Sequence, residues 1–82
     1  MIIQGVVADP SGQPVPGAVV MVAAAPVPVP DIAALTDATG RFSIMVSAPG
    51  TYRLLIRGAN AMTETTVSVH TEAVEVRAEL PG

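Results

Sequence analysis

Few residues in this chain of 82 can carry chemistry. It has no cysteine and no lysine, and His70 is its single histidine. A transition-metal site needs three or four clustered ligands, so it would have to combine His70 with carboxylates such as Glu72. The alternation of residues 62–69 places His70 on a solvent face. We therefore interpret His70 as an exposed structural histidine, and we expect no metal site and no cofactor.

Two aspartates are the next candidates, as ligands of a calcium ion. Asp9 and Asp37 open the related segments Asp-Pro-Ser-Gly and Asp-Ala-Thr-Gly, and hard cations bind loop carboxylates and carbonyls. An aspartate at the start of a turn also caps the backbone that follows it. We favour local capping, and the sequence leaves calcium binding open.

Nucleophilic catalysis requires a Ser, Thr or Cys beside an oriented base. Only His70 could be a histidine base, and no serine lies in an elbow-type turn. A hydrolase that uses His70 therefore ranks last among the functions considered. We predict that the chain is not an enzyme and has no catalytic residues.

Charge and hydropathy exclude two classes of partner. Seven acidic residues oppose four arginines, for a net charge of −3. The arginines are scattered singly, whereas a nucleic-acid-binding protein would show a basic stripe. The chain is 50% hydrophobic with a mean hydropathy of +0.55, yet no apolar run reaches the roughly 18–20 residues of a membrane span. We expect neither nucleic acid nor a membrane span.

The length predicts one domain, residues 1–82, with one core. Its first five residues lack the charged and apolar regions of a signal peptide. We expect a cytoplasmic protein if the chain is complete, and an extracytoplasmic one if it was cut from a longer exported protein.

Short β-prone runs alternate with Gly, Pro and Asp turns about every 8–12 residues, which is typical of a sandwich or barrel. Prolines at alternate positions in 26–30 predict an extended polyproline segment. The predicted strands are residues 2–8, 18–24, 41–46, 51–57, 62–69 and 73–80, with a short additional strand at 35–36.

Alternation within these runs assigns the core. Phe42 and Tyr52, the only aromatic residues, both fall on core faces, and we expect the Tyr52 hydroxyl to bond a backbone group between the sheets. Gly5 suits a place where a side chain packs over bare backbone, and Gly12 and Gly40 suit turns with positive φ. The other predicted core residues are Ile44, Val46, Leu54, Ile56, Thr65, Val67, Val69, Val74, Val76, Ala78 and Leu80.

Three spaced motifs carry a resemblance to a known family. They are Ile3-x-Gly5-x-Val7-x-Asp9-x-x-Gly12-x-Pro14-Val15-x-Gly17-Ala18-x-Val20, Thr36-Asp37-x-x-Gly40-Arg41-Phe42 and Pro49-Gly50-Thr51-Tyr52. Over residues 2–57 this order resembles the carboxypeptidase regulatory-like domain, one of the transthyretin-like (prealbumin-like) β-sandwiches. The resemblance implies an all-β Greek-key sandwich of six to seven strands. It also implies an accessory folding, spacing or docking unit of larger machinery.

The chain departs from its relatives in ways that bear on function. Gly58-Ala59-Asn60-Ala61 stands where family members often have a Gly-aromatic pair. One histidine and one tyrosine exclude the hydroxyisourate hydrolases and the intradiol dioxygenases of similar topology. The isopeptide bond of pilin-type domains cannot form without lysine, and the chain lacks the exposed aromatic residues on which sugar-binding relatives stack their ligands.

Outward apolar residues indicate an interaction surface. If the first two strands pair as a hairpin, Ile2, Val6, Val19 and Met21 form one contiguous patch, and such patches mark interfaces. Met45 and Leu55 also point outward but cannot be placed on a particular sheet. Alternatively, this face assignment is off by one residue, or the proline-rich segment at 26–30 covers the patch.

We therefore predict a non-catalytic structural or protein-interaction module. It would self-associate or dock to a protein partner through the outer face of its first hairpin. The alternative is a module that binds a small ligand or carbohydrate with the loop from Pro26 to Leu35 as its rim. The shortage of aromatic residues argues against this second function.

Overall fold

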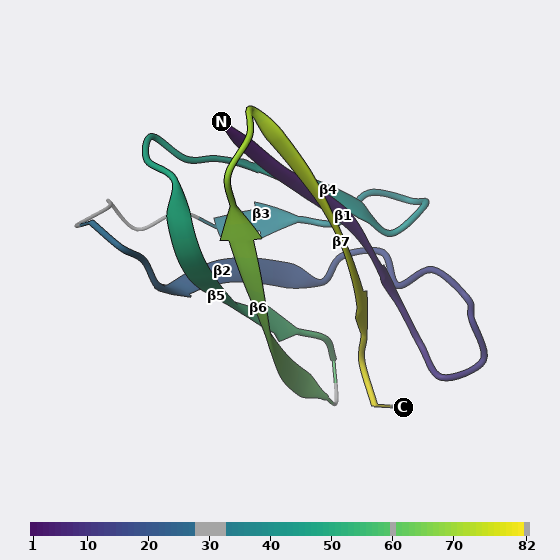
Figure 1. The fold of residues 1–82 in the computed structure, drawn as a ribbon. Helices are drawn as coiled ribbons and strands as arrows, with labels where there is room; N and C mark the ends of the chain where they lie inside the picture. Colours follow the sequence, from purple (N-terminus) through teal and green to yellow (C-terminus); the bar gives the residue numbers. More distant parts are fainter. Residues whose placement is uncertain (28–32, 60, 82) are drawn as a thin grey trace.

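The computed structural model describes residues 1–27, 33–59 and 61–81, in which seven strands form two sheets (Figure 1). The all-β sandwich prediction is confirmed, and the short additional strand exists at 33–35. The strands are β1 (Ile2–Ala8), β2 (Val19–Ala24), β3 (Ala33–Leu35), β4 (Arg41–Met45), β5 (Gly50–Arg57), β6 (Met62–Val69) and β7 (Ala73–Glu79).

One sheet has three strands in the order β4-β1-β7, and the other has four in the order β3-β2-β5-β6. β1 lies between an antiparallel neighbour, β4, and a parallel neighbour, β7. Because the first and last strands run side by side in the same direction, the two ends of the chain lie at opposite ends of that sheet (Figure 1).

The predicted hairpin of the first two strands is wrong, because β1 and β2 belong to different sheets. After a turn, the chain returns beside β1: Pro14 forms a bridge with Ala8, and the Val15 amide donates to the Val7 carbonyl over 2.9 Å. It then crosses to the four-stranded sheet. Residues 9–18 hold three prolines and are too long for the two- to five-residue loop of a typical hairpin.

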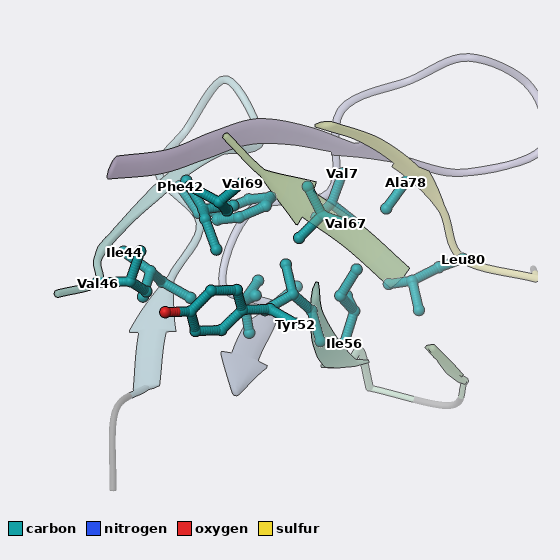
Figure 2. Close-up of a cluster of buried hydrophobic side chains, with 14 residues drawn as sticks. Val7, Phe42, Ile44, Val46, Tyr52, Ile56, Val67, Val69, Ala78 and Leu80 are labelled. Carbon is teal, nitrogen blue, oxygen red and sulfur yellow. The ribbon is translucent and has the colours of Figure 1, made fainter. Parts of the chain in front are cut away.

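The core lies between the sheets, where alternate side chains of both meet (Figure 2). Tyr52 is fully buried, and its ring extends through the cluster below Phe42 and Val69. Its hydroxyl donates to the Ala48 carbonyl over 2.6 Å, which confirms the predicted backbone hydrogen bond. The predicted faces of β6 and β7 are correct, but three of the predicted core residues on them are only half-buried: Thr65, Val74 and Val76.

Gly5 allows an aromatic ring to lie on the backbone of β1. It faces Phe42 on one neighbouring strand and Val76 on the other. A Cβ atom at Gly5 would collide with the Val76 carbonyl oxygen and lie 3.1 Å from the Phe42 ring. The predicted close approach is therefore confirmed, and its partner is Phe42.

Residues 28–32 lie outside the described residues. The polyproline conformation predicted for 26–30 and the ligand-binding rim predicted for the loop from Pro26 to Leu35 both fall partly on them. Within the described ranges, no helix is long and apolar enough to cross a membrane.

Candidate interaction surface

The two turns that begin with aspartate have the same hydrogen-bond pattern. In each, one carboxylate oxygen accepts bonds from a hydroxyl and two backbone amides, and the glycine that follows has a positive φ (+89° for Gly12, +76° for Gly40). Oδ1 of Asp9 accepts from Ser11 Oγ (2.6 Å), Ser11 N (3.0 Å) and Gln13 N (3.0 Å). Oδ1 of Asp37 accepts from Thr39 Oγ1 (2.7 Å), Thr39 N (2.9 Å) and Arg41 N (3.0 Å).

These bonds stabilise the ionised carboxylates. The hydroxyl of Ser11, followed by the Gln13 amide, lowers the pKa of Asp9 below its ordinary value. The hydroxyl of Thr39, followed by the Arg41 amide, does the same for the pKa of Asp37. The local capping role is thus confirmed. In the part of the chain that the structure describes, no three His, Asp or Glu side chains are grouped so that they could hold a metal ion.

His70 lies between β6 and β7, where its side chain is exposed. The neighbouring Glu72 is also exposed. The exposed position of His70 is the one that the alternation of residues 62–69 predicts.

The structure divides the four predicted interface residues between opposite faces of the sandwich. Ile2 and Val6 lie on the outer face of the three-stranded sheet, where Val6 has an arginine on each side. Val19 and Met21 lie on the outer face of the four-stranded sheet. The outward assignment of these four residues is correct, since β1 alternates along its length and β2 alternates at Val19–Met21, before its register with β5 shifts between Val22 and Ala24. The contiguous patch of Ile2, Val6, Val19 and Met21 does not form, because the strands do not pair.

A different apolar cluster forms on the four-stranded sheet. Val19 faces Leu35 across the β2–β3 pair, and Met21 faces Leu55 across the β2–β5 pair. We call these four residues the outer patch. Leu35 is 67% exposed and the other three are half-buried. Sequence reasoning did not name Leu35 as an interface residue, although the alternation that turns Thr36 inward would have placed its neighbour outward.

A charged group and a groove border the outer patch. Arg57 lies in one cross-strand row between Val19 and Met62, and Met62 is 58% exposed. Among the described residues Arg57 makes no ion pair, whereas Arg53 lies 3.8 Å from Glu64. Arg57 also lines a groove of about 480 Å³. The other residues lining it are Val15, Pro16, Gly17, Val19, Gly58 and Ala59.

The outer face of the three-stranded sheet is mixed in charge. Gln4 lies there between Ser43 and Glu75. A groove of about 450 Å³ on this sheet is lined by Arg41, Glu75 and Arg77, and an Arg41 nitrogen lies 3.7 Å from a Glu75 oxygen with both side chains over half exposed. Such pairs contribute little to stability. Elsewhere on this face Ile2 lies opposite Met45, which is 69% exposed, so the face combines charged residues with one apolar pair.

The fold and the surface together define a small β-sandwich module that carries the outer patch on its four-stranded sheet. The family profile of the carboxypeptidase regulatory-like domain matches residues 2–81, and the chain belongs to this family. The resemblance carried by the glycine, proline and aromatic positions is thereby confirmed, and it extends beyond residue 57 to the last two strands.

Two solved structures share the fold. One is a chain of a type II cohesin–X-dockerin complex from Acetivibrio cellulolyticus, with a TM-score of 0.73, 21% identity and coverage of 98% of this chain and 56% of that one. The other is chlorocatechol 1,2-dioxygenase from Pseudomonas putida, with a TM-score of 0.72, 12% identity and coverage of 99% and 59%. The chain thus spans less than two thirds of either structure. No curated protein matches it.

Proposed function

We propose that this chain is a non-catalytic protein-docking module, and that its partner binds the outer face of the four-stranded sheet. The observation that carries the proposal is the outer patch, in which three different strands bring four large apolar side chains to the surface. Contiguous exposed apolar surface of this kind marks interaction sites. Met21 can adapt its shape to a partner because its side chain is unbranched.

The border of the patch indicates the chemistry of the partner. Arg57 projects from the same row as Val19, and a guanidinium at an interface pairs best with a carboxylate. The adjoining groove offers space for a side chain beside this arginine. We propose that the partner presents an apolar segment with an aspartate or glutamate that meets Arg57.

The described side chains support a function without catalysis. Tyr52 is buried and bonded to the Ala48 carbonyl, so its hydroxyl is occupied. His70 is exposed between β6 and β7. The fold's occurrence in a cohesin–X-dockerin complex is consistent with a role inside a protein assembly. A carbohydrate-binding role has less support, because both aromatic rings are buried and cannot stack on a sugar.

Capture of the partner from the source organism tests the proposal. The immobilised wild-type chain, Met21→Glu and Ser43→Glu are compared, and captured proteins are identified by mass spectrometry. Ser43 is exposed on the outer face of the other sheet, so its variant is a control for added charge. We expect one protein to be retained by the wild type and by Ser43→Glu but lost from Met21→Glu. Equal retention by all three would contradict the proposal.

A further inference from the structure

We infer that two copies of this chain associate through the free edge of β6, in a two-fold antiparallel pair that joins their four-stranded sheets. β6 pairs with β5 on one side and is the last strand of its sheet. With eight residues it is the longest edge strand in the described part of the chain; the others have three, five and seven. This inference concerns a surface separate from the outer patch and does not depend on the proposed docking function.

The sequence of β6 has few of the usual protections against edge pairing, although β7 of the other sheet lies close to this strand. Soluble proteins shield edge strands with lysine, proline, bulges, inward charges or short length. β6 contains neither lysine nor proline, and its register with β5 continues without a bulge from Gly50–Val69 to Arg57–Met62. Its single charged residue, Glu64, points outward and lies 3.8 Å from Arg53. By contrast, β7 carries three outward charges and β3 is only three residues long.

The side chains of β6 are complementary to those of a second copy. When antiparallel strands pair, facing residues point to the same side of the sheet. In a register centred on Thr66, each outer residue of one copy therefore faces an outer residue of the other copy, and each inner residue faces an inner one. Glu64 then faces a serine rather than another glutamate, and the inner pairs are β-branched, which favours strand pairing. The facing pairs would be Thr66–Thr66, Glu64–Ser68, Thr65–Val67 and Thr63–Val69.

This pairing would place both outer patches on one side of the dimer. The two-fold axis is perpendicular to the joined sheet, because facing residues keep the same side. A partner with two binding segments could then engage both copies at once, and its avidity would exceed the affinity of one patch.

Charge variants at Thr66 test the pairing. Thr66 is exposed on the outer face of β6, so Thr66→Lys and Thr66→Glu should both fold, which circular dichroism checks. We expect the wild type to dimerise in analytical ultracentrifugation. Each variant alone should raise the dimer dissociation constant at least tenfold, because like charges would face each other across the axis. Their equimolar mixture should restore the dimer, now as a heterodimer.

Two controls separate this inference from the docking proposal. Ser43→Lys adds the same charge on the other sheet and should leave the dimer unchanged, as should Met21→Glu in the outer patch. A wild type that stays monomeric up to about 1 mM would overturn the inference. A tighter dimer of Thr66→Lys would also overturn it, because residue 66 would then face Glu64 of the second copy and not Thr66. Dissociation by Met21→Glu but not by Thr66→Lys would also overturn it and would place self-association on the outer patch.

Discussion

A single carboxylate oxygen organises each of the two aspartate turns. Oδ1 of Asp9 and Oδ1 of Asp37 each accept three hydrogen bonds from residues two and four positions further along the chain. The residue types alone predict this role, because a Ser or Thr two positions after the aspartate supplies the hydroxyl and glycine accepts the positive φ. These turns are local in sequence, so they could be predicted without knowledge of the sheets.

The lowered pKa values of Asp9 and Asp37 predict acid sensitivity. Because each carboxyl binds its proton less tightly in the folded than in the unfolded state, the resulting stabilisation is complete above the unfolded pKa of about 3.9. It is lost as the pH falls through the lower, folded-state pKa.

We expect the urea midpoint of the wild type to fall more steeply below pH 4 than that of the Asp9→Asn, Asp37→Asn double variant. This variant keeps the acceptor oxygens but cannot titrate. Glu72→Gln is the control for an exposed carboxylate, and identical pH profiles for wild type and double variant would contradict this account.

At the scale of the elements, Thr36 connects the end of β3 to the crossover between β1 and β2. Its buried hydroxyl donates to the Val15 carbonyl over 2.6 Å and accepts from the Ala18 amide over 2.8 Å. Thr36→Val keeps the shape but leaves both backbone groups without this partner. We expect the free energy of unfolding to drop by about 1–3 kcal/mol, measured by urea denaturation. Thr51→Val, on the exposed face of β5, should change it by less than about 0.5 kcal/mol; equal losses would show that the Thr36 hydroxyl is not structural.

The strands themselves were predictable, but their partners were not. Alternation located β6 at residues 62–69 and turned Val67 and Val69 inward, as observed. The same signal could not show that β1 pairs with β7, because period-two alternation fixes which face is buried and contains no information about the neighbouring strand. The hairpin prediction is wrong for this reason, because strands that are adjacent in the sequence need not be adjacent in a sheet.

At the scale of the whole molecule, the apolar surface depends on the strand order. Val19, Met21 and Leu55 were each predicted to point outward, and they do. Only the order β3-β2-β5 places them together and adds Leu35. The same topology moves Ile2 and Val6 to the opposite face, where Val6 lies between two arginines and Ile2 lies beside Met45. The apolar excess of the composition therefore predicts that an interaction surface exists. Which residues form it can be told only from the order of the strands.

The affinity of the captured partner for two matched variants tests the docking account most directly. Leu55→Glu places a charge in the outer patch, and Ser43→Glu places the same charge on the outer face of the other sheet. Isothermal titration should show that Leu55→Glu weakens binding at least tenfold, a loss of about 1.4 kcal/mol, while Ser43→Glu changes it by less than a factor of two. Equal affinities for the two variants, with both shown to be folded, would contradict the assignment of docking to the four-stranded sheet.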